Sequence, residues 1–291
     1  MHAVALLALG LALAAALAGC GLSSGAGGTS VRVLVTRDFG TKQVGARIYQ
    51  DLPSSDTATH LLARDFHVAA GRGRLPAGWF LAINGIGSQA GAVDATVHDG
   101  DAIWWDRHDS SATRGVPAVV GSFPEPFAHG SGGKRYPVVL ECADDVDAAC
   151  TTASDRLGAV GAIAGRQALG TGVGQDTTRV FVGRWSELRG DPALALIDQG
   201  PAASGVYVRF SSDGRRMGLL DPAGGVVQTL GAGAGLVAAT RFEQQAPTWV
   251  LTGTDVAGVA AAARALDERT LARRFALALN GSEPIGLPVV R

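Results

Sequence analysis

Lysine is nearly absent from this chain of 291 residues, where it occurs only at Lys42 and Lys134. The 25 basic residues, mostly arginine, are balanced by 26 acidic ones, and the formal net charge is −1 at pH 7. Proteins that bind nucleic acid rely on an excess of positive charge to neutralise phosphates. The composition therefore argues against a nucleic-acid partner.

Histidine is absent from the second half of the chain, and the last of the six histidines is His129. This absence excludes histidine acid–base chemistry and histidine-bound metals from residues 135–291. Two glycine-rich stretches, residues 170–174 and 231–235, do not match the Gly-x-Gly-x-x-Gly dinucleotide pattern and are predicted to be loops. We expect no catalytic residues, no metal site, no required cofactor and no enzymatic activity.

The amino terminus carries the clearest functional pattern. Residues 3–18 form an apolar run that is short for a membrane span and is typical of a signal peptide. The run ends in Leu17-Ala18-Gly19-Cys20, which resembles the lipobox of bacterial lipoproteins. Residues 1–20 are therefore predicted to be a lipoprotein signal, with lipid on Cys20 and the protein on the outer, extracellular face of the cell membrane. The alternative is an ordinary secretory signal with a chance cysteine.

Three cysteines make an odd number, which is awkward in an exported protein unless one of them is modified. If Cys20 is lipidated, Cys142 and Cys150 remain as a pair around a short acidic loop. We predict a local disulfide between them, because an oxidising compartment favours one. A metal site is the alternative, but no further Cys or His lies nearby to complete it.

The chain is predicted to be an α+β protein of two domains. Gly and Ser dominate residues 21–30, a predicted flexible tether. Residues 31–115 are predicted to form the first domain, with strands at 31–35, 45–49, 79–83 and 102–105 and a helix capped by Ser55-Asp56 and ending at Phe66.

A Pro-, Gly- and Ser-rich linker, residues 116–134, is predicted to separate the domains. Residues 135–291 alternate predicted strands and helices, which favours a mixed α/β domain of unassigned role. Strands are expected at 136–140, 179–183, 205–210, 217–220, 248–253 and 275–279, the last being the final strand. Helices are expected at 149–164, 192–198, 255–266 and from about 268.

Three segments of the first domain resemble a known family. They are Val-Thr-Arg-Asp-Phe-Gly at 35–40, Gly-Trp-Phe-Leu-Ala-Ile-Asn-Gly-Ile at 78–86 and His-Asp-Gly-Asp-Ala-Ile-Trp-Trp at 98–105. In this order they are similar to bacterial domains related to the C-terminal domain of transcobalamin and intrinsic factor. The resemblance spans residues 31–109 and implies a β-grasp-like fold. It also implies a ligand class, corrinoids such as cobalamin or another flat small molecule, since the equivalent domain of transcobalamin covers one face of cobalamin.

Candidate ligand-binding residues lie on strands next to turns of this domain: Trp79, Asn84, Trp104, Trp105 and His108. Adjacent residues of a strand face opposite sides, so Trp104 and Trp105 cannot both point into one core. Either one of them contributes to a binding patch or domain packing buries both. For Asn84 the alternative to ligand binding is a structural role in a turn. For His108 the alternative is a place in a polar, solvated loop after the strand.

The sequence favours a membrane-anchored surface lipoprotein that binds a small molecule, with a corrinoid as one candidate, as an accessory to uptake. Its expected partners are the membrane and a ligand or transporter component. The alternative is an envelope protein–protein interaction module without a small ligand. A hydrolase ranks last, because carboxylates such as Asp213, Asp221 and Asp255 sit at turns or caps that structure explains.

We predict that the native protein carries a fatty-acylated Cys20 at its amino terminus, because signal cleavage follows modification of that thiol. Mass spectrometry of the protein from its native envelope measures this directly. An unprocessed amino terminus without fatty acid would overturn the predicted location.

Overall fold

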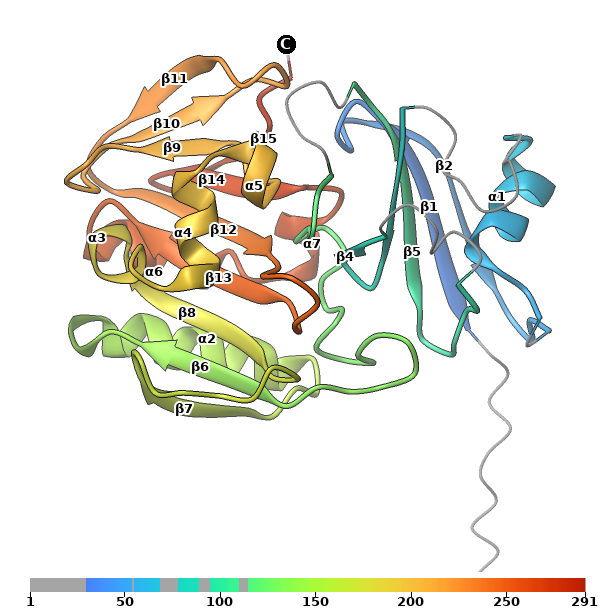
Figure 1. Cartoon of the computed structure of the whole chain (residues 1–291), viewed down its shortest axis with the longest axis horizontal. Coiled ribbons are helices and arrows are strands. Elements are labelled where there is room, and N and C mark those ends of the chain that lie inside the picture. Colours follow the sequence, from blue (N-terminus) through green and yellow to red (C-terminus); the bar gives the residue numbers. More distant parts are fainter. Residues whose placement is uncertain (1–29, 54, 69–77, 89–94, 110–114, 291) are drawn as a thin grey trace, which may run out of the picture.

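The computed structural model describes residues 30–53, 55–68, 78–88, 95–109 and 115–290 (Figure 1). In this part of the chain the strands form sheets of five, three and seven members, so the protein has the mixed α/β fold that the sequence predicts. The predicted signal peptide, Cys20 and all of the tether except Ser30 lie outside the described residues. Among the helices described, none is both long and apolar enough to span a membrane.

The N-terminal sheet contains the five strands that the structure describes before residue 108, in the order β2-β1-β5-β3-β4. Its central strands β1 and β5 are parallel, and its other neighbours are antiparallel. The helix α1 follows β2 in the chain and lies outside the sheet (Figure 1). The bounds are β1 Val31–Arg37, β2 Lys42–Tyr49, α1 Ala58–Phe66, β3 Trp79–Ile83, β4 Ile86–Gly87 and β5 Ala102–Arg107.

Both faces of this sheet bury apolar side chains, because successive residues of a strand point to opposite sides. One face packs on α1, where Val33 is buried with Leu61 and Leu62 of the helix. On the other face Phe80 and Trp104 are buried in a cluster shared with the C-terminal part of the chain. The N-terminal sheet is therefore an inner layer with packing on both sides.

The helix α1 begins after the predicted cap. Its N-cap is Thr57, whose side-chain oxygen accepts a hydrogen bond from the backbone N–H of His60 at 3.2 Å. Asp56 does not cap the helix, because its carboxylate faces the side chains of His60 at 3.1 Å and Arg64 at 3.5 Å.

The large C-terminal sheet has the order β15-β14-β12-β13-β8-β6-β7, and β13, β8, β6 and β7 are parallel neighbours. A separate small sheet has the order β11-β10-β9. The strand bounds are β6 Val138–Cys142, β7 Ala164–Ala168, β8 Thr178–Arg184, β9 Val208–Phe210, β10 Met217–Leu220, β11 Val226–Leu230, β12 Ala234–Thr240, β13 Thr248–Gly253, β14 Ala276–Asn280 and β15 Glu283–Leu287.

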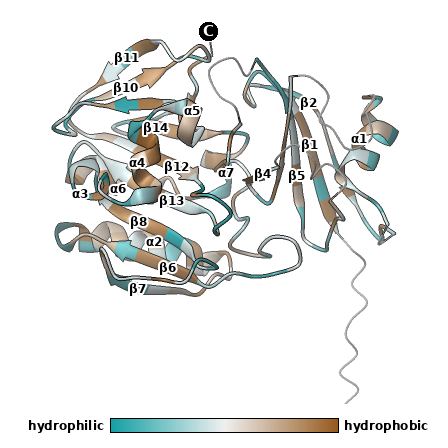
Figure 2. Ribbon diagram, viewed as in Figure 1, coloured by the Kyte–Doolittle hydropathy of each residue, from teal (hydrophilic) through white to brown (hydrophobic). Residues whose placement is uncertain are grey.

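Helices cover both faces of the large sheet (Figure 1). On one face α2 and α6 pack over a core that includes Leu140, Val182 and Leu251. On the other face α3, α4 and the small sheet cover Phe181 and Val250, and Figure 2 shows β8 as largely hydrophobic. The helix bounds are α2 Asp147–Ala159, α3 Trp185–Leu188, α4 Pro192–Asp198, α5 Pro201–Ser204, α6 Val256–Arg264 and α7 Glu268–Leu271, with a short 3-10 helix η2 at Asp144–Val146.

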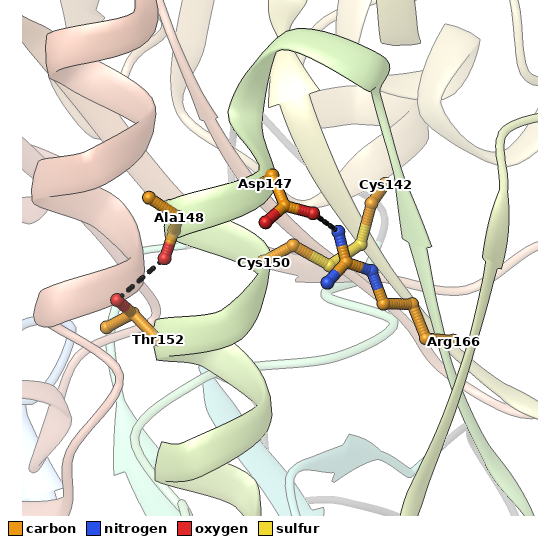
Figure 3. The surroundings of a disulfide bond; sticks show 6 residues. All are labelled: Cys142, Asp147, Ala148, Cys150, Thr152 and Arg166. Atoms are coloured by element: carbon orange, nitrogen blue, oxygen red, sulfur yellow. Dashed lines mark hydrogen bonds and ion pairs between the residues drawn. A yellow bond between two sulfur atoms is a disulfide. The ribbon is translucent and has the colours of Figure 1, made fainter.

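Cys142 and Cys150 form the predicted disulfide pair (Figure 3). Cys142 ends β6 and Cys150 lies in α2, with a Cα–Cα distance of 6.1 Å, and both are buried. At the start of α2, Asp147 pairs with Arg166 of β7. The beginning of the helix is thus tied to two neighbouring strands.

Several C-terminal elements differ from the sequence prediction, which lacked β7, β11, β12, β15, α3 and α5. The helix expected at 149–164 ends at Ala159, because Gly161 adopts φ 77° and the N–H of Ala162 returns to the carbonyl of Leu157 at 3.0 Å. The chain then enters β7, which the prediction missed. β14 is not the final strand, because a tight turn after Asn280 leads into β15.

The glycine-rich stretch 231–235, predicted as a loop, runs into β12. A Cβ on Gly235 would lie 2.5 Å from the carbonyl oxygen of Gly258. A Cβ on Gly253 would lie 2.6 Å from the carbonyl carbon of Gly258. These glycines let α6 approach the sheet at backbone distance. The glycines of this stretch are therefore explained by the close packing of α6 on the sheet and not by a flexible loop.

The strap, defined as residues 116–134, is the predicted linker, and it is packed between the two parts of the molecule. Its side chains Phe123 and Phe127 are buried under the large sheet against Trp249. Its backbone joins both sides: the N–H of Val119 donates to the carbonyl of Gly85 at 2.8 Å, and that of Val120 to Phe275 at 3.2 Å.

We predict that Gly121→Ala destabilises the protein by about 1–3 kcal/mol, the usual cost of overpacking. A Cβ at this position would lie 2.6 Å from the backbone nitrogen of Arg274 and 2.7 Å from the ring of Trp104. The measurement is urea unfolding, with Gly115→Ala as control because a Cβ there meets nothing within 4 Å. Equal stability of the two variants would contradict close packing at the strap.

Candidate functional site

An aromatic cluster joins the two parts of the chain, and Phe275 is its centre. The ring of Phe275 lies 5.2 Å from Phe39, 5.0 Å from Phe80, 5.0 Å from Trp104 and 5.3 Å from His108, measured between ring centroids. All four partners belong to the N-terminal sheet or its loops, whereas Phe275 leads into β14. Fully burying one such ring contributes about 2 kcal/mol, so this cluster holds the two parts together.

Tyr207 extends the cluster from the C-terminal side, with its ring 5.5 Å from that of Phe39. Its hydroxyl is buried and has no hydrogen-bond partner among the described residues. Burial, and to a lesser extent the charge of Asp109, raise the pKa of Tyr207 to about 12. This phenol therefore stays protonated at physiological pH.

A buried carboxylate, Asp106, fixes the turn that carries Phe39. Asp106 accepts hydrogen bonds from the backbone N–H of Phe39 at 3.1 Å and of Gly40 at 2.8 Å, and from the hydroxyl of Thr36. Nδ1 of His108 lies 2.6 Å from the same carboxylate. Phe39 has φ 57°, a left-handed conformation that costs roughly 1–3 kcal/mol in a non-glycine residue. The hydrogen bonds of Asp106 offset that strain.

Of the predicted ligand-binding residues, Trp79 and Trp105 lie on the α1 face of the N-terminal sheet. Trp105 is fully buried, and Trp79 is half-buried with its ring edge-on to Trp105 at 6.3 Å. Trp104 points to the opposite face and is also buried, with its indole N–H donating to the hydroxyl of Thr36 at 2.8 Å. Trp105 is thus buried in the core of the N-terminal part itself, and Trp104 is covered by the C-terminal part.

Asn84 and His108 are engaged in structural contacts. The amide of Asn84 donates to Asp101 at 2.7 Å and to the carbonyl of Gly130 at 2.8 Å, and it accepts from the N–H of Ala102 at 2.7 Å. His108 is buried with its ring stacked on Phe39 at 4.0 Å. The structure therefore does not bring the five predicted residues together in one cavity.

One of the five, Trp104, reaches an open hollow between the two parts of the chain. This hollow, which we call the cleft, has a volume of about 430 Å³. Strands β1, β2 and β5 form its floor, and the strap and the turn after α7 form the opposite wall. Its principal apolar lining residues are Leu34, Ala46, Ile48, Trp104 and Phe123.

The cleft has an apolar floor and a charged rim. Ile48 is 65% exposed, although it lies on the same sheet face as the buried ring of Trp104. The rim carries Arg32, Glu268 and Arg273. Arg32 lies 3.7 Å from Glu268, which leaves Arg273 without a carboxylate partner among the described residues. The arrangement suits a molecule with a flat apolar body and an acidic group.

A second hollow of about 580 Å³ lies on the C-terminal part, next to the glycine-rich loop 170–174. Its main charged group is Arg179, which bonds to Glu141 at 2.5 Å and to Asp191 at 2.8 Å. Burial lowers the pKa of Arg179, but the hydrogen bond to Glu141 and the charge of Asp191 outweigh it and raise the pKa. Glu141 and Asp191 are both paired with Arg179, so these three charges stabilise the fold. The stretch 170–174 is a loop, as predicted.

Two formal matches to nucleophile motifs occur in the chain. Ser131-x-x-Lys134 has the spacing of a serine–lysine pair, but these residues pair through their backbones in a turn, and the amine of Lys134 bonds to Asp176 at 2.5 Å. A Gly-x-Ser-x-Gly match at residues 21–25 lies outside the described residues. In the part of the chain that the structure covers, no group of three His, Cys, Asp or Glu side chains is placed to hold a metal ion.

No protein-family model matches the chain, and no curated protein matches its sequence. The cleft is formed by residues that are far apart in sequence, such as Leu34, Trp104 and Arg273. Sequence reasoning identified only Trp104, because a tryptophan beside a turn is a visible signal. Leu34 stands between two valines and Ile48 between Arg47 and Tyr49, so neither differs visibly from an ordinary strand residue.

We predict that Asp106→Asn lowers the free energy of unfolding by about 2–3 kcal/mol, because an amide NH₂ would face the backbone donors of Phe39 and Gly40. Urea unfolding measures the change. Asp99→Asn is the control, since Asp99 is exposed and an amide oxygen can still accept from the N–H of Ser30. A loss no larger than that of the control would show that Asp106 does not fix the turn.

Proposed function

We propose that this protein is a lipid-anchored lipoprotein on the outer face of a bacterial membrane and that it binds a small molecule in the cleft, without a catalytic role. The observation that carries the proposal is the apolar floor, exposed at Ile48 and partly buried at Leu34, beneath an arginine-bearing rim. Water-exposed apolar surface inside a concave site is typical of ligand pockets. An accessory role in uptake is part of the same proposal and is compatible with the proposed location.

The proposed anchor rests on the sequence pattern that ends in Cys20. A disulfide pair at Cys142 and Cys150 supports an oxidising, extracytoplasmic location. Stable anchoring takes more than one acyl chain, which lipoprotein processing provides. The predicted tether would let the folded part move relative to the membrane while staying bound.

For the N-terminal sheet we propose the β-grasp-like, transcobalamin-like assignment. Its support is the strand order β2-β1-β5-β3-β4, the parallel central pair and one helix between the two hairpins. In transcobalamin the equivalent domain covers one face of cobalamin. The cleft of about 430 Å³ is within the size range of small-ligand pockets. A corrinoid ring is larger, so only one of its faces would rest on the floor.

The alternative function is docking of an envelope protein, such as a transporter component. It is favoured by β2, which is an edge strand of the N-terminal sheet and carries Val44 at 55% exposure and Ile48 at 65%. An unpaired strand edge with apolar side chains is a surface to which another chain can add a strand.

We predict that Ile48→Ser weakens binding of two probes, cyanocobalamin and anilinonaphthalene sulfonate, by roughly fivefold through lost apolar contact. The full chain in neutral detergent is titrated and read by absorbance for the first probe and fluorescence for the second. Stability should change little, because Ile48 is exposed.

Val44→Ser is the matched control, since Val44 is exposed on the same strand but does not line the cleft. Equal binding of both probes by the wild type and Ile48→Ser would refute the cleft as the site. If anilinonaphthalene sulfonate binds but cyanocobalamin does not, a corrinoid ligand is excluded. If neither probe binds and both variants lose the same envelope partner in a pulldown, the docking function is the correct one.

A further inference from the structure

A third hollow lies on the opposite side of the turn that closes the cleft. We call it the arginine hollow; its volume is about 460 Å³, and its walls include Thr41, Arg273, Arg274, Ile285, Pro288 and Val290. The loop after β1 forms one side, and β15 with the segment that follows it forms the other. It shares only Ala272 and Arg273 with the cleft.

The charge in the arginine hollow is unbalanced. Its described lining contains two guanidinium groups and no carboxylate. Arg274 has no ion pair and no side-chain hydrogen bond within the part of the chain that the structure covers, and Arg273 only approaches the side-chain oxygen of Gln43 at 3.5 Å. Asp38, which precedes the loop, already pairs with Lys42 at 2.9 Å. No described side chain therefore neutralises this pair.

Arg274 is half-buried in these surroundings. Burial, and next the charge of Arg273, lower its pKa, but an arginine keeps its charge in proteins. A cation that is partly removed from water and faces a like charge is unfavourable unless an anion joins it. Among the described side chains, the hollow therefore has an excess of positive charge that a bound anion would neutralise.

The backbone that presents Arg274 is rigidly held. A Cβ on Gly40 would lie 1.9 Å from the carbonyl oxygen of Arg273, and one on Gly121 would lie 2.6 Å from the nitrogen of Arg274. The turn is therefore clamped on both sides at backbone distance. The N–H of Arg274 also donates to the carbonyl of Leu271 at 3.1 Å. A fixed backbone reduces the entropy lost when the guanidinium group binds a ligand.

The other wall of the hollow is apolar. Ile285, Val289 and Val290 are only partly buried against the core beneath them. A ligand with a charged head at Arg274 and an apolar body along this wall would satisfy both features. Guanidinium groups recognise phosphate and carboxylate through paired hydrogen bonds.

From this combination we propose that the arginine hollow is a binding site for an amphiphilic oxyanion, a phosphate or carboxylate head on an apolar body, held by Arg274 with help from Arg273. The site shares only Ala272 and Arg273 with the cleft and does not depend on the function proposed there.

The test is calorimetric titration of the full chain in neutral detergent with phenyl phosphate, benzoate and benzyl alcohol. Phenyl phosphate tests for a phosphate head group and benzoate for a carboxylate head group. Benzyl alcohol has a similar apolar body without the charge. We expect at least one anion to bind and benzyl alcohol not to bind. Arg274→Gln should weaken that binding by about tenfold or more, the effect of losing charged hydrogen bonds.

Arg269→Gln is the matched control, because Arg269 is exposed on α7 and does not line the hollow. It should bind the anions as the wild type does, and so should Ile48→Ser, which separates this site from the cleft. Without ligand, Arg274→Gln should melt no lower than the wild type, since it removes an unpaired charge. Wild-type protein that binds neither anion, or Arg274→Gln with unchanged affinity, would overturn the proposal.

Discussion

The insertion of Phe275 among Phe39, Phe80, Trp104 and His108 is the contact on which the rest of the structure depends. It places the start of β14 directly against the N-terminal sheet. Because it fills only the half of that sheet face near β3 and β5, the half near β1 and β2 remains uncovered. The cleft is the space that this off-centre packing leaves.

The same contact explains why two hollows flank one turn. The segment Leu271–Phe275 must pass between Gly40 and Gly121 to bring Phe275 into place, and both glycines lie against its backbone. Arg273 and Arg274 are carried into the junction by this geometry. One hollow opens toward the sheet floor and the other toward β15, so the junction presents cationic groups to two separate volumes.

Local patterns in the sequence predicted most elements and the cysteine pair. Alternation correctly placed Trp104 and Trp105 on opposite faces, and most strands have the predicted positions. The pattern failed where small residues dominate: β12 is buried throughout and carries no alternation, so its glycines resembled a loop. The binding residues were harder still. Asn84 looked available as a donor, yet its amide is used by Asp101, Ala102 and Gly130, contacts that depend on the strap folding back.

The strap has a consequence for dissecting the molecule. Phe123 and Phe127 belong to the core beneath α2 and α6, while Val116 and Val119 belong to the junction core. Dividing the chain within this segment would separate strap side chains from one of the two cores that they complete, and apolar surface would be exposed on both fragments. Limited proteolysis of the native protein should therefore spare the strap, and neither half is a sensible unit for expression by itself.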